Sequence, residues 1–347
     1  MTVSWPVRIV GILYLLALGF AAVASCDGSG PRRAPVPVVN AFERREVRLP
    51  FVWRGIPRTA LPSPTPRPTP GPRDTLIASV QGFARVRGVD GAGARGRSCV
   101  VTSLAAVGSG TLADCLSRSG RWITFSRRGR IAPVEDLRVP SNTTIDARGA
   151  GVELYGRGLI ISRSQNVIVA GLAITGCEED AIQIAEHAQG IHLTGLVLSR
   201  CGDGLVDVTD GSTDVTLADS TLRDHAKAML IGASDAHSSD TVIRVTIANV
   251  IFATTYRHPL CRFGYVHLDR VTVGPWRGDA VDARFGCRVL ITRSAFAPGG
   301  KEESAAAARF TVASSPGAIR VDDATDLGGQ WAEVGGVVAD PPYRLAP

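Results

Sequence analysis

Short stretches of alternating apolar and polar residues recur along the chain from about Asn166 onward. The stretch 167–174 is echoed at 191–198, 215–222, 245–252, 266–273 and 289–296, so successive starts lie 24, 24, 30, 21 and 23 residues apart. Each stretch is rich in β-branched residues and bounded by Gly, Asp, Ser or Asn, which is typical of short strands joined by turns. Periods of this length, with several strands in each, predict an all-β solenoid of stacked coils.

Other architectures fit this pattern less well. No helical pattern of useful length separates the stretches, which argues against a doubly wound sheet or a β/α barrel. The Leu/Asn spacing of leucine-rich repeats is missing, and a propeller would need periods nearer ~40 residues. The chain has 347 residues, of which 45% are hydrophobic, 38 are Gly and 21 are Pro, so it can form a large, turn-rich core.

Polar side chains recur at the same period as the strands. Residues one period apart stack in neighbouring coils of a solenoid, about 4.8 Å apart. Glu178 and Asp180 are two residues apart, and the pair Asp203 and Asp207 follows one period later, so we expect each pair on one face of a strand. The residues expected to line one side of the solenoid are Glu178, Asp180, Asp203, Asp207, Lys227, Arg257 and Arg262.

Four carboxylates in one cluster repel each other unless a cation lies among them. All-oxygen ligands in a loose arrangement favour Ca²⁺ over Mg²⁺. The alternative is that Asp203 and Asp207 are ordinary turn residues. The chain contains only two lysines, Lys227 and Lys301, so the place of Lys227 beside these acids favours a functional site.

Five segments carry further information in their order and spacing. They are residues 101–116, SNTTIDARGA at 141–150, DGLVDV at 203–208, HAKAML at 225–230 and RHPLCRFGY at 257–265. In this order they resemble polysaccharide lyase family 1, the pectate lyases, and the resemblance spans about residues 80–300. Two departures from the family pattern are Glu178, where Asp is usual, and the stretch 192–195, where the family often has Trp-x-Asp-His.

The resemblance implies a right-handed parallel β-helix and a calcium-dependent lyase that cleaves polygalacturonate by β-elimination. The calcium ligands that it implies are Glu178, Asp180, Asp203 and Asp207. It implies Lys227, Arg262 and Arg284 as binders of the substrate carboxylates, with Lys227 also stabilising the developing charge. It assigns the catalytic base to Arg257.

The assignment of the base leaves an alternative open. Arginine is a poor base on general grounds, since its pKa lies above about 12. His258, the next residue, is the conventional choice, but in a strand its side chain would point to the opposite face. Three other functions also remain as alternatives: a polygalacturonase, a pectin lyase without the calcium carboxylates, and a non-catalytic, surface-anchored polysaccharide-binding protein.

The N-terminal part of the chain differs from the rest. An apolar run follows Arg8 and ends at Cys26, which predicts a lipoprotein-type signal peptide over 1–26; an ordinary signal peptide or a membrane anchor are the alternatives. Residues 27–74 form a Pro/Arg-rich linker, and 75–347 form the β-helix domain. We therefore expect the domain outside the cytoplasm, secreted or lipid-anchored at the cell surface or in the periplasm.

Charge and cysteine content narrow the expected partners. The formal net charge is +6, but residues 75–347 hold equal numbers of acidic and basic side chains, which argues against nucleic-acid binding. We expect a monomer that contacts a membrane only through its N-terminal anchor. Leaving out Cys26, six cysteines remain, and spacings near one coil predict the disulfides Cys177–Cys201 and Cys261–Cys287. Cys99–Cys115 then follows by elimination, and buried free thiols are the alternative.

Overall fold

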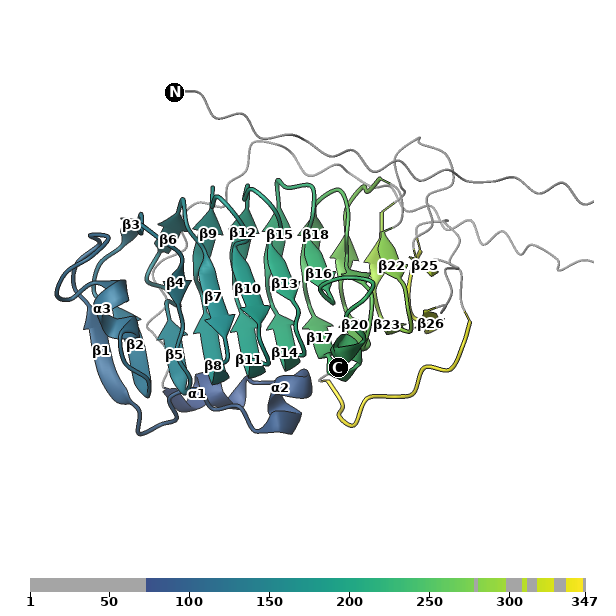
Figure 1. Ribbon diagram of the computed structural model, residues 1–347, viewed down its shortest axis with the longest axis horizontal. Coiled ribbons are helices and arrows are strands. Elements are labelled where there is room, and N and C mark those ends of the chain that lie inside the picture. Colours follow the sequence, from purple (N-terminus) through teal and green to yellow (C-terminus); the bar gives the residue numbers. More distant parts are fainter. Residues whose placement is uncertain (1–72, 278–279, 298–307, 311–316, 328–334, 346–347) are drawn as a thin grey trace, which may run out of the picture. The chain divides into compact units, whose positions relative to one another are not determined.

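The computed structural model describes residues 73–277, 280–297, 308–310, 317–327 and 335–345. The expected signal peptide and the linker before Arg73 lie outside the described residues. In the described part, the strands form three parallel sheets that run side by side along stacked coils (Figure 1). We call these sheets A, B and C.

Sheet A contains β1 Arg97–Val101, β2 Arg121–Phe125, β5 Thr143–Asp146, β8 Gln165–Ala170, β11 Gln189–Thr194, β14 Thr213–Ala218, β17 Arg244–Ala248, β20 Tyr265–Asp269, β23 Arg288–Thr292 and β26 Ala318–Val321. Sheet B contains β3 Gly129–Ile131, β6 Val152–Tyr155, β9 Ala173–Thr175, β12 Val197–Ser199, β15 Thr221–Arg223, β18 Ile251–Ala253, β21 Thr272–Val273 and β24 Ala295–Phe296. Sheet C contains β4 Leu137–Arg138, β7 Leu159–Ser162, β10 Ile182–Ala185, β13 Val206–Val208, β16 Met229–Ile231, β19 Leu260–Cys261, β22 Val281–Ala283 and β25 Ala308–Phe310.

The period predicted from the sequence agrees with the strand register of sheet A. The starts of the six recurring stretches are direct partners in successive strands: Val167, Ile191, Val215, Val245, Val266 and Val289. All of these side chains are fully buried, because they face the interior of the coils. The predicted parallel β-helix is therefore confirmed, and its core is a set of aliphatic stacks.

Each recurring stretch contains a strand of sheet A, a corner and a strand of sheet B. The corner residue has a left-handed backbone in successive coils, with φ of 71° at Gly171, 63° at Gly195, 49° at Asp219 and 55° at Asn249. Gly, Asp and Asn adopt this conformation at the lowest cost, which explains their regular spacing in the sequence. The corner breaks the stretch into two strands that the sequence pattern alone did not separate.

Short helices cover the outer face of sheet A. Helices α1 Arg73–Ala78 and α2 Gly82–Arg87 pack Leu76 and Ala84 against Trp122 and Ile168. Figure 1 shows both helices beside the strands of sheet A. Two further short helices are α3 Leu112–Leu116 and the 3-10 helix η1 Ser238–Val242. Within the described residues, no helix is long and apolar enough to cross a membrane.

The three predicted disulfides are all present. Cys177–Cys201 and Cys261–Cys287 join residues 24 and 26 positions apart, which is about one coil. Cys99–Cys115 ties β1 to α3 near the start of the domain. Three disulfides are typical of proteins that fold in an oxidising compartment.

Burial of His192 makes the stability of the fold depend on pH. The imidazole lies in β11 on the outer face of sheet A, between Ile168 and Thr216, and neither ring nitrogen has a hydrogen-bond partner. Burial lowers the pKa of His192 to about 4. Because this value is lower than the unfolded value of about 6.5, the neutral ring favours the folded state above pH 6.5, and this contribution disappears as the pH falls toward 4.

We therefore predict that the free energy of unfolding falls between pH 6.5 and pH 4, with up to about 3 kcal/mol of the loss due to His192. His192→Leu should flatten this pH dependence, as measured from denaturant midpoints at several pH values. His187→Asn, at an exposed turn position, is the control and should leave the slope unchanged. An equal slope in His192→Leu and the original protein would contradict the prediction.

Candidate active site

The predicted site residues lie where the chain passes from sheet B to sheet C. Glu178 and Asp180 lie in the loop between β9 and β10, and Asp203 lies in the equivalent loop of the next coil. Only Asp207 lies within a strand, β13. The expectation that Glu178, Asp180 and Asp203 lie on strand faces was therefore wrong, because the chain bends at this corner. The stacking of the coils still brings the loops together.

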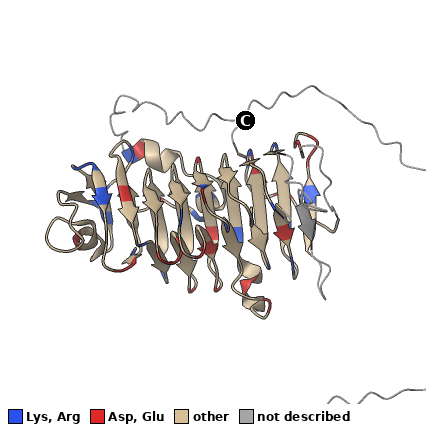
Figure 2. Cartoon of the chain, turned by 90° about the horizontal axis from the view of Figure 1, so that it is seen from above, with Lys and Arg blue, Asp and Glu red and all other residues tan. Residues whose placement is uncertain are grey.

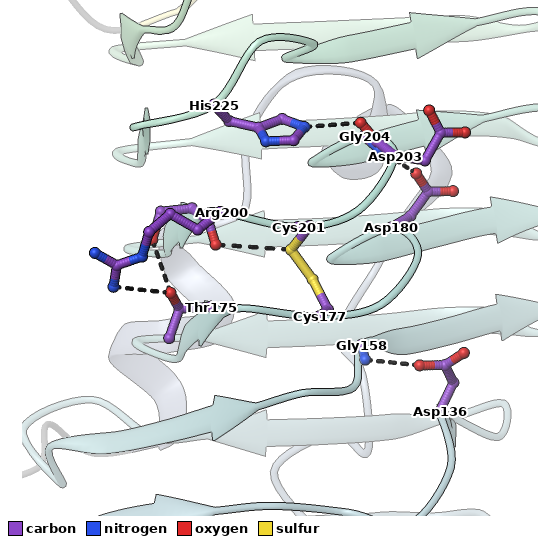
Figure 3. Close-up of a disulfide and its surroundings, with 11 residues drawn as sticks. Asp136, Gly158, Thr175, Cys177, Asp180, Arg200, Cys201, Asp203, Gly204 and His225 are labelled. Carbon is purple, nitrogen blue, oxygen red and sulfur yellow. Dashed lines mark hydrogen bonds between the residues drawn. A yellow bond between two sulfur atoms is a disulfide. The ribbon is translucent and has the colours of Figure 1, made fainter.

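Three of the four predicted carboxylates gather around Gly204. The Gly204 backbone N–H donates to Asp180 Oδ1 at 2.7 Å. A Cβ at Gly204 would lie 2.7 Å from Asp207 Oδ1 and 2.8 Å from Asp180 Oδ1, so both oxygens face the same small space. Figure 3 shows Asp180 and Asp203 in neighbouring coils, which the Cys177–Cys201 disulfide also joins.

The carboxylates of this cluster act on one another. Burial, together with the charges of Asp180 and Asp203, raises the pKa of Asp207 to about 8. Burial is also the main cause that raises the pKa of Asp180, with further contributions from Asp203 and Glu179. The cluster therefore cannot hold all of its negative charge at neutral pH without a cation.

Lys227 supplies part of the missing positive charge. Its Nζ donates to Asp203 Oδ1, and this hydrogen bond is the main cause that lowers the pKa of Asp203. The imidazole Nε2 of His225 also contacts the Asp203 carbonyl oxygen at 2.7 Å (Figure 3). Asp203 is thus the carboxylate of the cluster that is paired with a cation.

The donor set fits a hard cation. Asp180, Asp203 and Asp207 offer only oxygen atoms, they repel one another, and the missing side chain at Gly204 leaves room between two of them. As they stand, no three His, Cys, Asp or Glu side chains in the described part of the chain form a metal-binding group. The carboxylate side chains would therefore have to move closer together to bind an ion.

Glu178 is not part of this cluster in the structure. Its carboxylate accepts from Arg157 Nη1 at 2.7 Å and is 65% exposed. Glu179 is the residue whose charge acts on Asp180. Since Ile182 pairs with Val206, the register places Glu179 level with Asp203, which a strict count of one 24-residue period back from Asp203 would have indicated.

Arg257 and Arg284 line one cavity with Lys227. The other residues of its wall are Tyr256, Leu260 and Asp282. Arg257 has a left-handed backbone, with φ of 63°, and its charge acts on both Asp203 and Asp207. The guanidinium of Arg284 donates to Asp282 Oδ2 at 2.6 and 2.9 Å. Lys227, which donates to Asp203, connects this cavity with the carboxylate cluster.

Arg262 is held apart from this cavity. Its Nε donates to Asp235 Oδ1 at 2.7 Å and its Nη1 to the Gly232 carbonyl oxygen at 3.0 Å. Both acceptors belong to the segment that lengthens the 30-residue coil, so the extra residues of this coil provide partners for Arg262. The side chain is 17% exposed.

The alternative base, His258, faces the interior. Its side chain is fully buried, packs against Phe252 with ring centroids 5.5 Å apart, and has Nδ1 3.0 Å from the Ala280 carbonyl oxygen. Burial lowers the pKa of His258 to about 4. The expectation that His258 points away from Arg257 agrees with this placement.

Tyr256 was not singled out from the sequence. It is 40% exposed and lies directly before Arg257, and its backbone forms a parallel bridge with that of Lys227. An exposed aromatic side chain beside two cations can pack against a sugar ring. The signal available in the sequence was its position directly before the RHPLCR motif.

Solved structures of the same architecture define the class of protein. The major cedar pollen allergen jun a 1 superposes with a TM-score of 0.67 at 25% identity, covering 79% of this chain and 92% of the allergen. A pectate lyase from Bacillus sp. N165, solved in complex with trigalacturonate, gives a TM-score of 0.65 at 19% identity, covering 77% of this chain and 94% of that protein. The chain is thus a parallel β-helix protein with the fold of the pectate lyases.

Sequence comparison finds similarity to pectate lyases over part of the chain. The pectate lyase family model matches residues 199–312. Pectate lyase 4 of Ambrosia artemisiifolia is 37% identical over 169 residues, which are 42% of this chain and 43% of that protein. A pectate lyase of Lilium longiflorum is 32% identical over 225 residues, 56% and 51% of the two chains. Over these segments the chain is similar to the pectate lyases, and it spans about half the length of the curated relatives that it matches.

The space above Gly204 leads to a prediction about the carboxylate cluster. Gly204 does not have a left-handed backbone, so alanine is tolerated there, but its Cβ would separate Asp180 from Asp207. We expect Gly204→Ala to weaken calcium binding by at least about tenfold in titration calorimetry while the fold is retained. Gly274→Ala is the control, because Gly274 also lacks a left-handed backbone and its Cβ would come no closer than 3.2 Å to another atom. Unchanged calcium affinity in Gly204→Ala would show that the ion binds elsewhere.

Proposed function

We propose that this protein is a calcium-dependent pectate lyase that cleaves polygalacturonate by β-elimination. The observation that carries the proposal is the cluster of Asp180, Asp203 and Asp207 beside Lys227 and Arg257 at one corner of a pectate lyase β-helix. The trigalacturonate bound by the Bacillus relative supports an acidic polysaccharide as the substrate. Crystals of pectate lyase C from Erwinia chrysanthemi with Ca²⁺ support calcium as the cofactor.

β-Elimination at a uronate requires loss of the proton at C5 and then of the oxygen at C4. The C5 proton is not acidic while the adjacent carboxylate keeps its full negative charge. Lys227 is the cation proposed to bind this carboxylate, because it lines the cavity together with Arg257 and Arg284. Calcium bound by the cluster would supply further neutralisation and stabilise the developing negative charge.

Arg257 is the group proposed to accept the C5 proton. Its side chain lies at the junction of the carboxylate cluster and the cavity with Lys227, so it faces the place where the uronate would bind. Asp203 and Asp207 stabilise the charged guanidinium, and neutralising these two acids would remove that stabilisation. A strained backbone at Arg257 is in keeping with a functional position.

Two proposed ligands would have to leave their present partners. Glu178 would exchange Arg157 for the calcium ion, and Arg262 would exchange Asp235 for a substrate carboxylate. Arg284 lines the cavity with Lys227 and Arg257, and its guanidinium is bonded to Asp282 in the same wall. The role of Glu178 as a calcium ligand and that of Arg262 as a substrate binder therefore require a side-chain rearrangement when the ion or the substrate binds.

The same proposal covers the setting of the enzyme. A polymeric substrate lies outside the cytoplasm, which agrees with the three disulfides of the domain. The signal peptide at 1–26 would then direct export, and the linker at 27–74 would hold the β-helix domain at 75–347 away from a membrane. The protein would act as a monomer, lipid-anchored through Cys26 or secreted.

The reaction itself can be followed directly. With polygalacturonate and Ca²⁺, ultraviolet absorbance should rise as unsaturated product forms, and excess chelator should abolish the rise. Chain cleavage without this absorbance would indicate a polygalacturonase, and full activity in chelator would exclude the calcium mechanism. Binding of the polymer without any cleavage would indicate a non-catalytic polysaccharide-binding protein.

Arg257→Lys should lower kcat by at least about a hundredfold, because charge is kept but the geometry of the guanidinium is lost. Calcium binding and thermal stability should stay close to those of the original protein. Arg277→Lys, at an exposed arginine that follows Trp276, is the matched control and should leave kcat unchanged. An Arg257→Lys variant with normal kcat would place the base on another residue.

A further inference from the structure

Charge is unevenly distributed along the described coils. Residues 73–130 contain ten arginines and three acidic residues, whereas residues 131–347 contain 19 basic and 26 acidic residues. Residues 73–130 form α1, α2 and the first coils and carry a positive surplus of seven, whereas the remainder of the sequence carries a negative surplus of the same size. Figure 2 shows blue segments in the first strands, at the left of the view, among the blue and red segments along the stack.

Four of these arginines line one pocket at the start of the first two strands of sheet A. They are Arg95, Arg97, Arg118 and Arg121. The small residues Ala92, Gly96, Ser119 and Gly120 form the rest of the wall. Arg97 and Arg121 are register partners in β1 and β2, and the Arg97 N–H donates to the Gly120 carbonyl oxygen at 3.0 Å, so two neighbouring loops form the pocket.

The positive charge of this pocket is not balanced locally. No acidic side chain lines it. Asp90 instead accepts from Asn166 Nδ2, and Asp114 accepts from the Gly110 N–H, each at 2.8 Å. Among the residues that the structure describes, none of the four arginine side chains has an ion-pair or hydrogen-bond partner. Four unpaired guanidinium groups around one hollow favour a ligand with several negative charges.

The loop that carries Arg95 and Arg97 is held in place before any ligand binds. Arg73 Nη1 donates to the carbonyl oxygens of Ala94 at 3.1 Å and Gly96 at 2.7 Å. The guanidinium of Arg73 also lies over the ring of Trp122, 4.9 Å from its centroid. A fifth arginine thus fixes the backbone, so a ligand would not have to order this loop.

We propose that this pocket is a second, non-catalytic binding site for acidic polysaccharide. Arginine presents a planar fork of donors that matches a carboxylate, and a polyuronate offers carboxylates in series to neighbouring arginines. An anionic membrane is the less suitable occupant, because the pocket is lined by glycine, alanine and serine and offers no large apolar side chain to insert into lipid. The proposal rests on the proposed function for the identity of the polymer.

The two sites occupy different parts of the domain. The carboxylate cluster lies at the corner between sheets B and C, in the coils of β10 and β13, whereas the arginine pocket lies at the amino ends of β1 and β2 in sheet A. One long polymer, or two chains in a polymer network, could therefore occupy both sites. Linked sites raise the affinity for a polymer without any new contact in the cleft.

The test compares two double variants of equal charge change. Arg95→Ser with Arg118→Ser removes two exposed pocket arginines, and Arg163→Ser with Arg223→Ser removes two exposed arginines from other coils. Retention on insoluble polygalacturonate is measured in excess chelator, so that calcium-dependent turnover cannot interfere. We expect the pocket variant to bind about tenfold more weakly or worse, and the control to bind as the original protein does.

Kinetics provide a second readout. The pocket variant should show a raised KM for long polygalacturonate, while its kcat and its rate on trigalacturonate stay unchanged. Circular dichroism and thermal melting check that both variants fold. Arg95→Lys with Arg118→Lys keeps the charge and should lose less binding than the serine pair.

Failure of the two proposals can be told apart. A protein without lyase activity whose polymer binding still depends on Arg95 and Arg118 would refute the proposed function and leave the pocket in place. The pocket proposal is wrong if the protein does not bind the polymer in chelator, if the pocket variant is retained as well as the original protein, or if the control pair loses as much binding. It is also wrong if the pocket variant loses binding only to phosphatidylglycerol vesicles, measured by co-sedimentation, and not to the polymer.

Discussion

Stacking of one coil on the next is the interaction on which the rest of this structure depends. A single coil cannot bury its own apolar side chains, so each is stable only against its neighbours. The backbone hydrogen bonds of three parallel sheets fix the register, and this register places Val167, Ile191 and Val215 in one buried stack. The same register decides which loop residues meet at the surface, so the core and the site have one geometric cause.

The carboxylate cluster shows what this register costs. Asp180 and Asp207 are brought together because their coils are neighbours, although burial and mutual repulsion raise the pKa of both. The Gly204 N–H partly offsets the cost at Asp180, and Lys227 does so at Asp203. A stack of aliphatic side chains and the Cys177–Cys201 disulfide hold the loops, so the site can keep an arrangement that is unfavourable in the absence of a cation.

The sequence predicted the coils best where alternation was strong. The register of the recurring stretches was correct to the residue, because inward β-branched side chains repeat at every coil. Most strands of sheet C are only two to four residues long, and they gave no periodic signal of their own. The first coils were also hidden, since polar segments such as 117–121 separate their strands. Residues at corners were the hardest to place: the register sets Glu179, and not Glu178, level with Asp203.

Partners from inserted segments could not be predicted from the period at all. The 30-residue coil adds a loop whose Asp235 and Gly232 carbonyl bind Arg262, and nothing in the spacing indicated this contact. The motif predicted that Arg262 lies close to Arg257, but it contains no information on Asp235, the acidic residue that pairs with Arg262. Local sequence therefore fixed the strands, while the state of each charged side chain depended on coils that are distant in sequence.

A solenoid also allows different coils to carry different charge. The acids that gather in the cleft would repel a polyanionic substrate, and only cations in the same cleft, Lys227 and Arg257 among them, counter that repulsion. Residues 97–130, from the start of β1 into β3, hold six arginines and one acidic residue, and these coils do not contribute to the carboxylate cluster. Attraction of a polyanion can therefore be supplied by one part of the stack and chemistry by another, because the potential of the basic coils extends over a Debye length of about 8–10 Å. Under the proposed function, the division of charge along the coils would separate the attraction of an acidic polymer from the acidic cluster that acts on it.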